Sequence, residues 1–167
     1  MAYFKYFNLV GYDIRGKKNN QQFDIVTNIL QRARLKPDFI KNNTFFAKYF
    51  VMDGETPEKL AFQFYGDTEL HWVIMFANKV TNPYYDWPQT YLDLQKYITK
   101  KYGAGNENNI HHYEDVDGYE VDSDAAGATS ITNSVYEEKR NDNLRTIDVI
   151  RAENVNSVVN ELKTLLK

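Results

Sequence analysis

The chain has 167 residues, of which 43% are hydrophobic and 15% aromatic, and its formal net charge at pH 7 is -3. This length and hydrophobic content suffice for one ordinary domain or for two small ones that share contacts. A mildly acidic chain lacks the broad cationic surface that neutralises phosphates, so no nucleic acid is expected as a partner. The sequence contains no cysteine, which excludes disulfides, thiolate nucleophiles and zinc-thiolate sites.

No stretch of the sequence stays apolar over the roughly 20 residues that a membrane-spanning helix requires. The longest uninterrupted apolar run is residues 72–77, and the N-terminus lacks the apolar core of a signal peptide. We therefore expect no membrane partner, and we expect the chain to be made in the cytosol and assembled there into something larger.

Residues 1–44 are predicted to be an N-terminal interaction segment. The chain opens with several aromatic side chains, among them Tyr3, Phe4 and Phe7. Aromatic groups so near a terminus are usually docked on another surface, because a free end gains nothing from exposing them.

A short helix over residues 25–30 is predicted within this segment, with Asp24 as its cap. A basic cluster follows at Arg32, Arg34 and Lys36. We interpret this cluster as a solvated helix end whose cations suit the helix dipole, and not as a binding patch.

A strand is predicted over residues 45–52, which are rich in aromatic and β-branched side chains and run into a turn at Gly54. Thr56 is predicted to be the N-cap of the helix that follows, with Pro57 at its first position, where no backbone donor is needed. Gly66 stands where a left-handed C-cap would end this helix.

A second helix is predicted from a cap at Asp67 to Asn78, and it is apolar on nearly all sides. Helical spacing directs Leu70, Val73, Ile74 and Ala77 towards the core and leaves Trp72, Met75 and Phe76 off that face. Trp72 with His71 would suit an aromatic sugar platform, but packing against the third helix or the N-terminal segment is the favoured interpretation.

A third helix is predicted to begin at Asp86-Trp87-Pro88 and to end at Gly103. Its buried side is expected to carry Tyr91, Leu94, Ile98 and Tyr102. Residues 45–103 are thus predicted to form a core with one added helix.

Residues 105–124 are acidic and contain no lysine or arginine. Asp117-Gly118 between two short strands predicts a hairpin with a type I′ turn, and residues 125–129 are expected to be a mobile link. The spaced loop of a calcium-binding EF-hand is missing, and His111 and His112 are expected to point to opposite faces of a strand, so no metal site is predicted.

Three elements are predicted for the end of the chain: a helix from Ser134 to Asn143, a strand over residues 146–150 and an amphipathic helix with Asn154 as its cap. Residues 104–167 are therefore expected to combine the hairpin, a linker and a C-terminal helical interaction region.

No catalytic constellation is recognisable in the sequence. It has no Gly-x-Ser-x-Gly elbow, no glycine-rich phosphate loop and no dinucleotide fingerprint. An acid pair in the hairpin is the remaining catalytic hypothesis, and only the acids themselves support it. We predict that the protein is not an enzyme, with no catalytic, cofactor-binding or metal-binding residues and no cofactor.

The sequence resembles the LysM module, a β-α-α-β glycan-binding fold, in residues 51–61, 65–67 and 72–74 and at Asn78. Together with His71-Trp72, Asn82-Pro83, Asp86-Trp87-Pro88, Lys101-Tyr102-Gly103 and residues 136–150, it resembles the baseplate wedge protein 53 family of contractile-tailed bacteriophages. That resemblance extends from about Asp24 to Lys167. The fold expected is α+β: a small LysM-like β-α-α-β core with added helices, an acidic β-hairpin and a C-terminal amphipathic helix.

A usual LysM module returns to its second strand soon after the asparagine. Here a helix is expected after Pro88 instead, so the second strand is predicted to come from the hairpin at residues 110–122. This departure argues against a freestanding sugar groove.

The family resemblance implies a structural subunit of the tail baseplate that clamps neighbouring wedge proteins during assembly. The implied partners are other wedge proteins and tail hub or tube proteins, with one or two copies of this chain in each of six wedges. The implied location is the virion, with assembly in the host cytoplasm. The candidate subunit interface consists of Tyr3, Phe4, Phe7, Trp72, Met75, Val155, Val158, Leu162, Leu165 and Leu166.

The alternative is a peptidoglycan-binding LysM module of a cell-wall-associated or lytic protein. It would place a glycan in a groove formed by Gly54, Glu55, Thr56, Pro57, Asn78 and Asn82.

Overall fold

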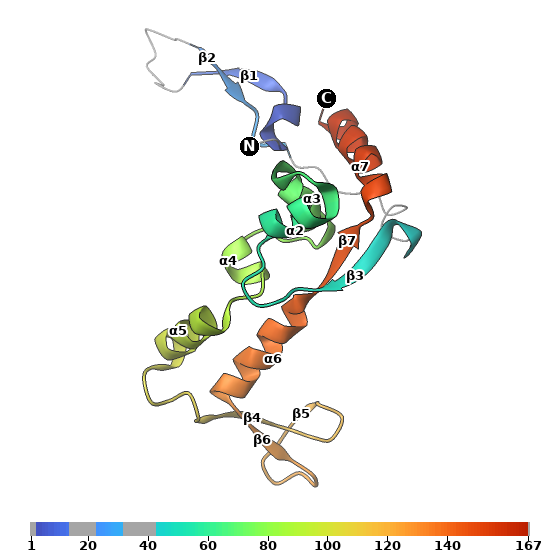
Figure 1. Cartoon of the computed structure of the whole chain (residues 1–167). Coiled ribbons are helices and arrows are strands. Elements are labelled where there is room, and N and C mark those ends of the chain that lie inside the picture. Colours follow the sequence, from blue (N-terminus) through green and yellow to red (C-terminus); the bar gives the residue numbers. More distant parts are fainter. Residues whose placement is uncertain (1–2, 14–22, 32–42, 167) are drawn as a thin grey trace. The chain divides into compact units, whose positions relative to one another are not determined.

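A computed structural model describes residues 3–13, 23–31 and 43–166 (Figure 1). The fold is α+β and separates into two compact units. Unit 1 comprises residues 1–48, 55–80 and 148–167, and unit 2 comprises residues 49–54 and 81–147. Each unit joins stretches from distant parts of the chain, whereas the three predicted segments were contiguous in sequence.

Helices and short strands alternate along the described residues. In chain order they are η1 (Tyr3–Tyr6), β1 (Leu9–Tyr12), β2 (Asp24–Thr27), η2 (Asn43–Phe45), β3 (Phe46–Phe50), α2 (Pro57–Tyr65), η3 (Thr68–Leu70), α3 (His71–Ala77), α4 (Pro83–Asp86), α5 (Tyr91–Tyr102), β4 (Ile110–Glu114), β5 (Glu120–Val121), β6 (Thr129–Thr132), α6 (Asn133–Arg145), β7 (Thr146–Ile150) and α7 (Ala152–Leu165).

The predicted helix after Asp24 is wrong, because β2 occupies its first half. β2 pairs antiparallel with β1, with Leu9 opposite Thr27 and Tyr12 opposite Asp24. Three successive β-branched residues, 25–27, favour an extended chain, and the helical spacing of the apolar residues did not reveal the partner strand. The basic cluster at residues 32–36 lies outside the described residues.

β3 pairs with β7, which follows it by almost a hundred residues (Figure 1). At one end the Val51 N–H donates to the Arg145 carbonyl at 2.8 Å, and at the other the Arg151 N–H donates to the Phe45 carbonyl at 2.9 Å. The predicted strand at residues 146–150 is confirmed. The partner strand of β3 is therefore β7, and the prediction that the hairpin at 110–122 supplies this strand is wrong.

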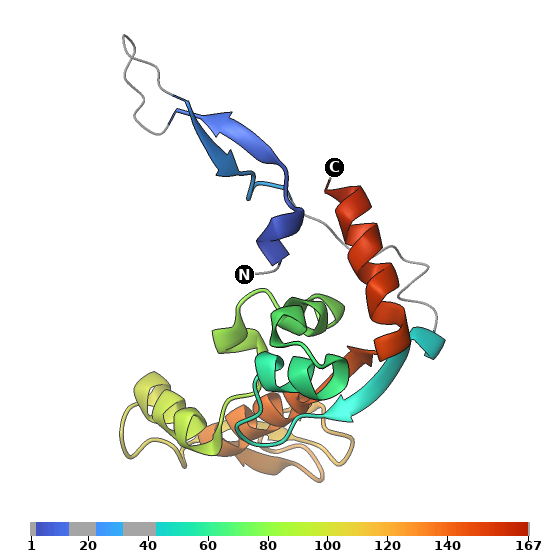
Figure 2. The same cartoon turned by 45° about the horizontal axis from the view of Figure 1, so that its top comes forward.

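The predicted capping of α2 is confirmed. Thr56 accepts a hydrogen bond from the Lys59 N–H, and Pro57 takes the first position of the helix. Gly66 ends it in the left-handed conformation with φ of 73°, which a residue without a Cβ adopts without strain. Asp67 then accepts from the Glu69 N–H and starts η3, which leads into α3. α2 and α3 lie beside each other in both views (Figure 1, Figure 2).

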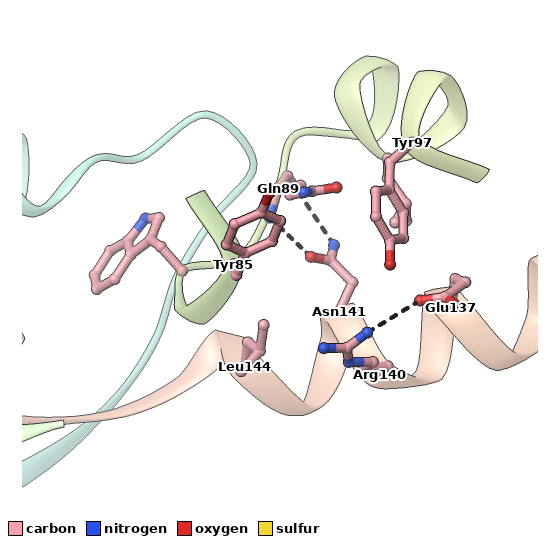
Figure 3. A pocket seen from close by; sticks show the side chains of 9 residues that line it. Tyr85, Gln89, Tyr97, Glu137, Arg140, Asn141 and Leu144 are labelled. Atoms are coloured by element: carbon pink, nitrogen blue, oxygen red, sulfur yellow. Dashed lines mark hydrogen bonds and ion pairs between the residues drawn. The ribbon is translucent and has the colours of Figure 1, made fainter. Parts of the chain in front are cut away.

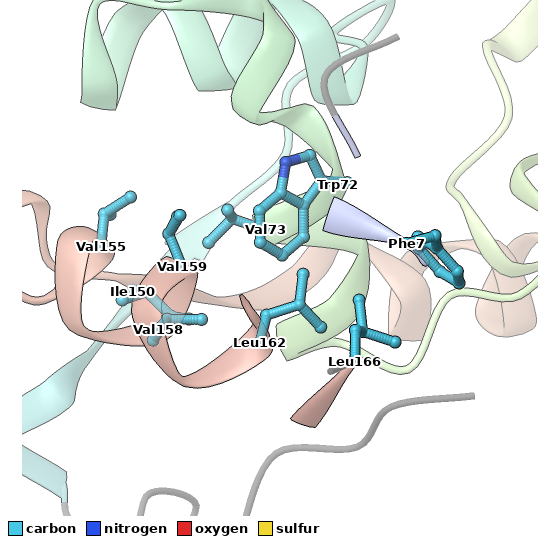
Figure 4. Packing of buried hydrophobic residues seen from close by; sticks show 9 residues of the cluster. All are labelled: Phe7, Trp72, Val73, Ile150, Val155, Val158, Val159, Leu162 and Leu166. Atoms are coloured by element: carbon cyan, nitrogen blue, oxygen red, sulfur yellow. The ribbon is translucent and has the colours of Figure 1, made fainter. Parts of the chain in front are cut away.

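The core of unit 1 lies between α7, α3 and β7 (Figure 4). It contains Phe7, Trp72, Val73, Ile150, Val155, Val158, Val159, Leu162 and Leu166. The rings of Tyr3 and Tyr6 in η1 lie 5.3 and 6.1 Å from the Trp72 ring, centroid to centroid. Docking of the N-terminal aromatics is thus confirmed, as is the packing of Trp72 against the N-terminal segment.

The predicted cap at Asn154 is wrong: α7 begins after Arg151, which makes no side-chain cap.

The predicted start of the third helix is also wrong. Asn82 accepts from the Tyr84 N–H and begins the short α4, whereas Trp87 is extended, as expected for a residue before proline. α5 begins after Thr90, which accepts from the Asp93 N–H and donates to the Asp93 carboxylate. A threonine followed three residues later by an aspartate was the cap signal missed in the sequence.

α5 ends at Gly103 as predicted, with φ of 87°. Leu94 and Ile98 are buried, as expected, and Tyr102 is partly buried, but Tyr91 is exposed. The buried stripe of α5 is therefore narrower than the sequence pattern suggested.

The acidic region forms a three-stranded sheet in the order β5-β4-β6. β6 begins at Thr129 and pairs with β4, so the predicted mobile link at 125–129 is wrong at its end. The I′ turn is wrong as well, because among the turn residues only Gly118 has a positive φ, whereas that turn needs two. Asp115 instead accepts from the N–H groups of Asp117 and Tyr119 and stabilises a longer loop.

α6 leads directly from β6 into β7, and Thr132 caps it by accepting from the Val135 N–H. The predicted helix at 134–143 is confirmed, with one further residue at the start and two at the end. Within the described part of the chain, no helix combines the length and apolar character needed to cross a bilayer.

Asn78 fixes α3 to β7, and its removal should weaken unit 1. Its side-chain amide donates to the carbonyls of Ile74 and Asp148 and accepts from the Asp148 N–H at 2.7 Å. We expect Asn78→Ala to lower the free energy of unfolding by about 2–3 kcal/mol, because it leaves partly buried backbone groups without partners. Urea unfolding followed by circular dichroism measures this. The exposed Asn160→Ala is the control, and a loss no larger than in the control contradicts the role given to Asn78.

Candidate functional site

A small pocket in unit 2 lies between α4, α5 and α6 (Figure 3). It is lined by Tyr85, Trp87, Gln89, Leu94, Tyr97, Glu137, Arg140, Asn141 and Leu144. Its volume is about 30 Å³, which holds a water molecule or two and no organic substrate. The polar groups around it therefore matter for what they hold together and not for what they enclose.

One face of α6 is polar and yet turned inward. Asn133, Glu137, Asn141 and Arg145 follow one another at intervals of four residues, so they share a side of the helix. The first three are buried, and the Arg145 side chain is only 12% exposed. We refer to these four residues as the polar stripe of α6. Buried polar groups are costly unless they are hydrogen-bonded, so their partners define the site.

Glu137 is the most buried charge of the stripe, with 2% of the residue exposed. Its Oε1 is 2.5 Å from the Lys101 Nζ and accepts from the Tyr102 hydroxyl at 2.9 Å. The Arg140 guanidinium lies 3.7 Å from the other carboxylate oxygen (Figure 3). The hydrogen bond to Glu137 raises the pKa of Lys101, and burial raises the pKa of Tyr102. The cluster is therefore a charged contact that fixes α5 to α6.

Asn141 holds the segment before α5 through a reciprocal pair of bonds. Its side chain accepts from the Gln89 N–H at 2.7 Å and donates to the Gln89 carbonyl at 3.1 Å. The two dashed lines between these residues in Figure 3 mark this pair. An amide side chain that matches a peptide group in this way fixes both position and orientation.

The two ends of the stripe bind loops. Asn133 donates to the Asn106 carbonyl at 2.9 Å in the segment after α5. Arg145 donates to the Val51 carbonyl at 3.2 Å and to the Asp53 carboxylate at 3.3 Å after β3. Every member of the stripe thus has a partner in a different part of unit 2, and α6 organises that unit.

A second cluster joins β4 to the outer side of α6. A β-bulge between Ile110 and His112 brings both histidines to one side, so the expectation that they point to opposite faces is wrong. The His111 ring stacks on Tyr136 with centroids 3.9 Å apart, and its Nδ1 lies 2.8 Å from the His112 Nδ1. Glu114 pairs with His112 and with Lys139. Among the described residues no three histidine or acidic side chains are placed to hold a metal ion.

The predicted groove residues have mainly structural places. Thr56 caps α2, Pro57 is buried at its first turn, and Asn82 caps α4. Asn78 bonds to the backbone of β7. Gly54 has a positive φ of 76° with open space at its α-carbon, and Glu55 is half-buried. None of the six lines the pocket described above.

The predicted interface residues divide into two sets. Phe7, Trp72, Val155, Val158, Leu162 and Leu166 are buried in the core of unit 1. Tyr3 and Met75 are half-buried, Phe4 is 39% exposed and Leu165 45%. The stripe of α7 therefore packs on the body of its own chain, and among these ten residues Phe4 and Leu165 have the most surface for a partner.

No role for Glu137, Asn141 or Gln89 was predicted from the sequence. A signal was present, because Asn133, Glu137 and Asn141 recur at a helical interval. A search for apolar periodicity passes over such a stripe, since polar residues are normally assigned to the solvent side.

These clusters bond side chains to one another and to backbone, which is the chemistry of a scaffold. Comparison with known proteins agrees: the model of the family described as base plate wedge protein 53 matches residues 2–126. The chain belongs to this family. A baseplate wedge protein of Enterobacteria phage T4, gp53, is 26% identical over 143 residues, covering 71% of this chain and 72% of the T4 protein. This wedge protein therefore has a structural role in a phage tail baseplate, and its location is the virion tail.

Two esterases of Mycobacterium tuberculosis, MT1326 of strain CDC 1551 and Rv1288 of strain H37Rv, are also similar to a part of this wedge protein. Each is 40% identical over 58 residues, which is 35% of this chain and 11% of the esterase. A match to so small a part of an enzyme transfers no esterase activity.

Breaking the Glu137 cluster should destabilise unit 2. We expect Glu137→Ala to lower the free energy of unfolding by about 2–3 kcal/mol, somewhat less than for a fully buried ion pair, because the Lys101 side chain is 39% exposed. The neighbouring Glu138→Ala is the control, and urea unfolding is the measurement. Equal effects of the two substitutions would show that Glu137 has no special part in stability.

Acid should weaken the contact between β4 and α6. The hydrogen bond from Lys139 lowers the pKa of Glu114 below its ordinary 4.5. A lowered folded-state pKa gives stability that is present above 4.5 and is lost as the pH falls through the folded value. We expect Glu114→Gln to flatten this acid loss in urea midpoints measured between about pH 6 and pH 3. Asp124→Asn should leave the slope unchanged, and a wild-type slope in Glu114→Gln would refute the assignment.

Proposed function

We propose that this wedge protein ties neighbouring wedge proteins together during baseplate assembly, and that it does so without enzymatic activity. The family match over residues 2–126 carries the proposal. The polar stripe and the β3–β7 pair support it, because a protein that fixes others in place must itself be rigid. Tail hub or tube proteins are proposed as further partners, with one or two copies of this chain in each of six wedges and assembly in the host cytoplasm.

Exposed apolar side chains in both units supply contact surfaces for such a role. In unit 1, Leu9, Tyr12, Phe23 and Ile25 of the β1–β2 ribbon are each at least 60% exposed. A two-stranded ribbon is marginally stable alone in water, and monomers rarely expose contiguous apolar surface without a partner. We define the ribbon face as Leu9, Phe23 and Ile25, whose side chains fall on one side according to the register.

Unit 2 has its own exposed aromatic side chains. Tyr84, Tyr85, Tyr91 and Leu92 at the starts of α4 and α5 are all largely exposed. Tyrosine is enriched at the energetic centres of protein interfaces. A subunit with separate apolar surfaces in its two units has what a connector between neighbours requires.

The peptidoglycan alternative gains no support from the geometry. Thr56, Asn78 and Asn82 use their side-chain oxygen or amide groups within the chain itself. A glycan at these positions would have to compete with caps and with the attachment of β7.

The proposed function is tested on purified phage particles. We expect the chain in tail baseplates in a copy number that is a multiple of six, by quantitative mass spectrometry and by electron microscopy of the baseplate. Absence of the chain from finished particles would refute a connecting role.

The ribbon face is tested by a double variant that carries both Leu9→Asp and Ile25→Asp. We expect incorporation into baseplates to fall roughly tenfold or more while the unfolding midpoint of the free protein hardly changes, because both side chains are exposed and a charge at an apolar contact costs several kcal/mol. Phe62→Asp, at an exposed apolar position on α2, is the control. Normal incorporation of the double variant would remove the ribbon face from the proposal.

A further inference from the structure

The tip of the β4–β5 hairpin exposes large apolar side chains. Val116 is 90% exposed and Tyr119 is 71% exposed, and they stand on either side of the turn at Asp117-Gly118. Neither residue belongs to the core of unit 2. Their contribution to folding is therefore small, and a contact with another molecule is the remaining use for such surface.

The tip is held in one shape before any partner arrives. The Asp115 carboxylate accepts from the Asp117 and Tyr119 N–H groups, both at 2.9 Å, and the Asp115 carbonyl accepts from the Gly118 N–H at 3.1 Å. Gly118 has a φ of 85°, which this turn requires. A loop ordered in advance loses less conformational entropy on binding.

Four carboxylates lie close to these two residues in the sequence: Asp117, Glu120, Asp122 and Asp124. All four residues are exposed, and none has a cationic partner among the described residues. Other acids of unit 2 do have such partners: Glu114 pairs with Lys139, and Glu137 pairs with Lys101. We call Val116, Tyr119 and these four acids the acidic tip. None of these four charges is paired with a described cation, and the bonds to Asp115 order the backbone of the turn.

We propose that the acidic tip docks on a basic protein surface that offers an apolar recess for Val116 and Tyr119. Negative charge next to exposed apolar side chains is complementary to lysine and arginine next to an apolar pocket. The same charge repels phosphates, which excludes nucleic acid and anionic lipid as occupants. The partner is another protein of the same baseplate, and in this respect the inference rests on the proposed function.

The test measures binding of the full chain to each wedge protein of the same phage, purified separately, at about 50 mM and about 300 mM NaCl. We expect one of them to bind the wild-type chain, and Glu120→Gln/Asp122→Asn to weaken that binding roughly tenfold at the lower salt and much less at the higher. Glu58→Gln/Glu153→Gln removes the same charge from exposed positions in unit 1 and should change the affinity less than about twofold. Tyr119→Ser should speed dissociation at both salt concentrations.

Several outcomes overturn the inference. Equal effects of the two charge-neutralising pairs would show that the tip has no special role. Binding that needs calcium and persists at high salt would show that the carboxylates hold a cation. Either result leaves the proposed function standing, because a wedge protein still binds. If no wedge protein binds the wild-type chain and the chain is absent from baseplates, the proposed function fails together with the inference.

Discussion

The polar stripe of α6 is the constraint on which unit 2 depends. Four residues at intervals of one helical turn bind the surrounding segments: Asn133 the chain after α5, Glu137 the end of α5, Asn141 the segment before α5, and Arg145 both that segment and the loop after β3. A buried polar group is destabilising when it lacks its hydrogen-bond partner, whereas packed apolar side chains can shift against one another at little cost. The stripe therefore specifies one arrangement of these segments, which an apolar face of equal area would specify less sharply.

Unit 1 is stabilised differently. Its core is apolar and is formed by α7, α3, β7 and the N-terminal aromatics, and polar contacts such as those of Asn78 act at its border. A hundred residues separate Lys48 in β3 from its salt-bridge partner Asp148 in β7, so folding must close a long loop before this pairing forms. The entropic cost of closure grows only slowly with loop length, which allows all the elements of unit 2 to lie between the paired strands.

A connecting subunit needs rigidity inside and attractive surfaces outside, and the distribution of side chains meets both needs. The polar stripe of α6 bonds to other parts of unit 2, while apolar residues of the β1–β2 ribbon, the starts of α4 and α5, and the hairpin tip are exposed. No chemistry among these residues points to a substrate. The exposed residues offer apolar contact area and charge to other proteins, which is consistent with membership of a family of baseplate structural proteins.

The sequence by itself determined the local features: the caps at Thr56 and Asp67, the stop at Gly66, the strand at 146–150 and the apolar stripe of α7. Each of these features can be predicted from the residue pattern of its own segment. Tertiary structure decided the pairing of β3 with β7, the strand at 24–27, the third strand of the acidic sheet and the burial of Glu137 and Asn141. Each depends on a partner distant in sequence, and whether a strand forms or a polar residue is buried is determined by whether that partner can satisfy its hydrogen bonds.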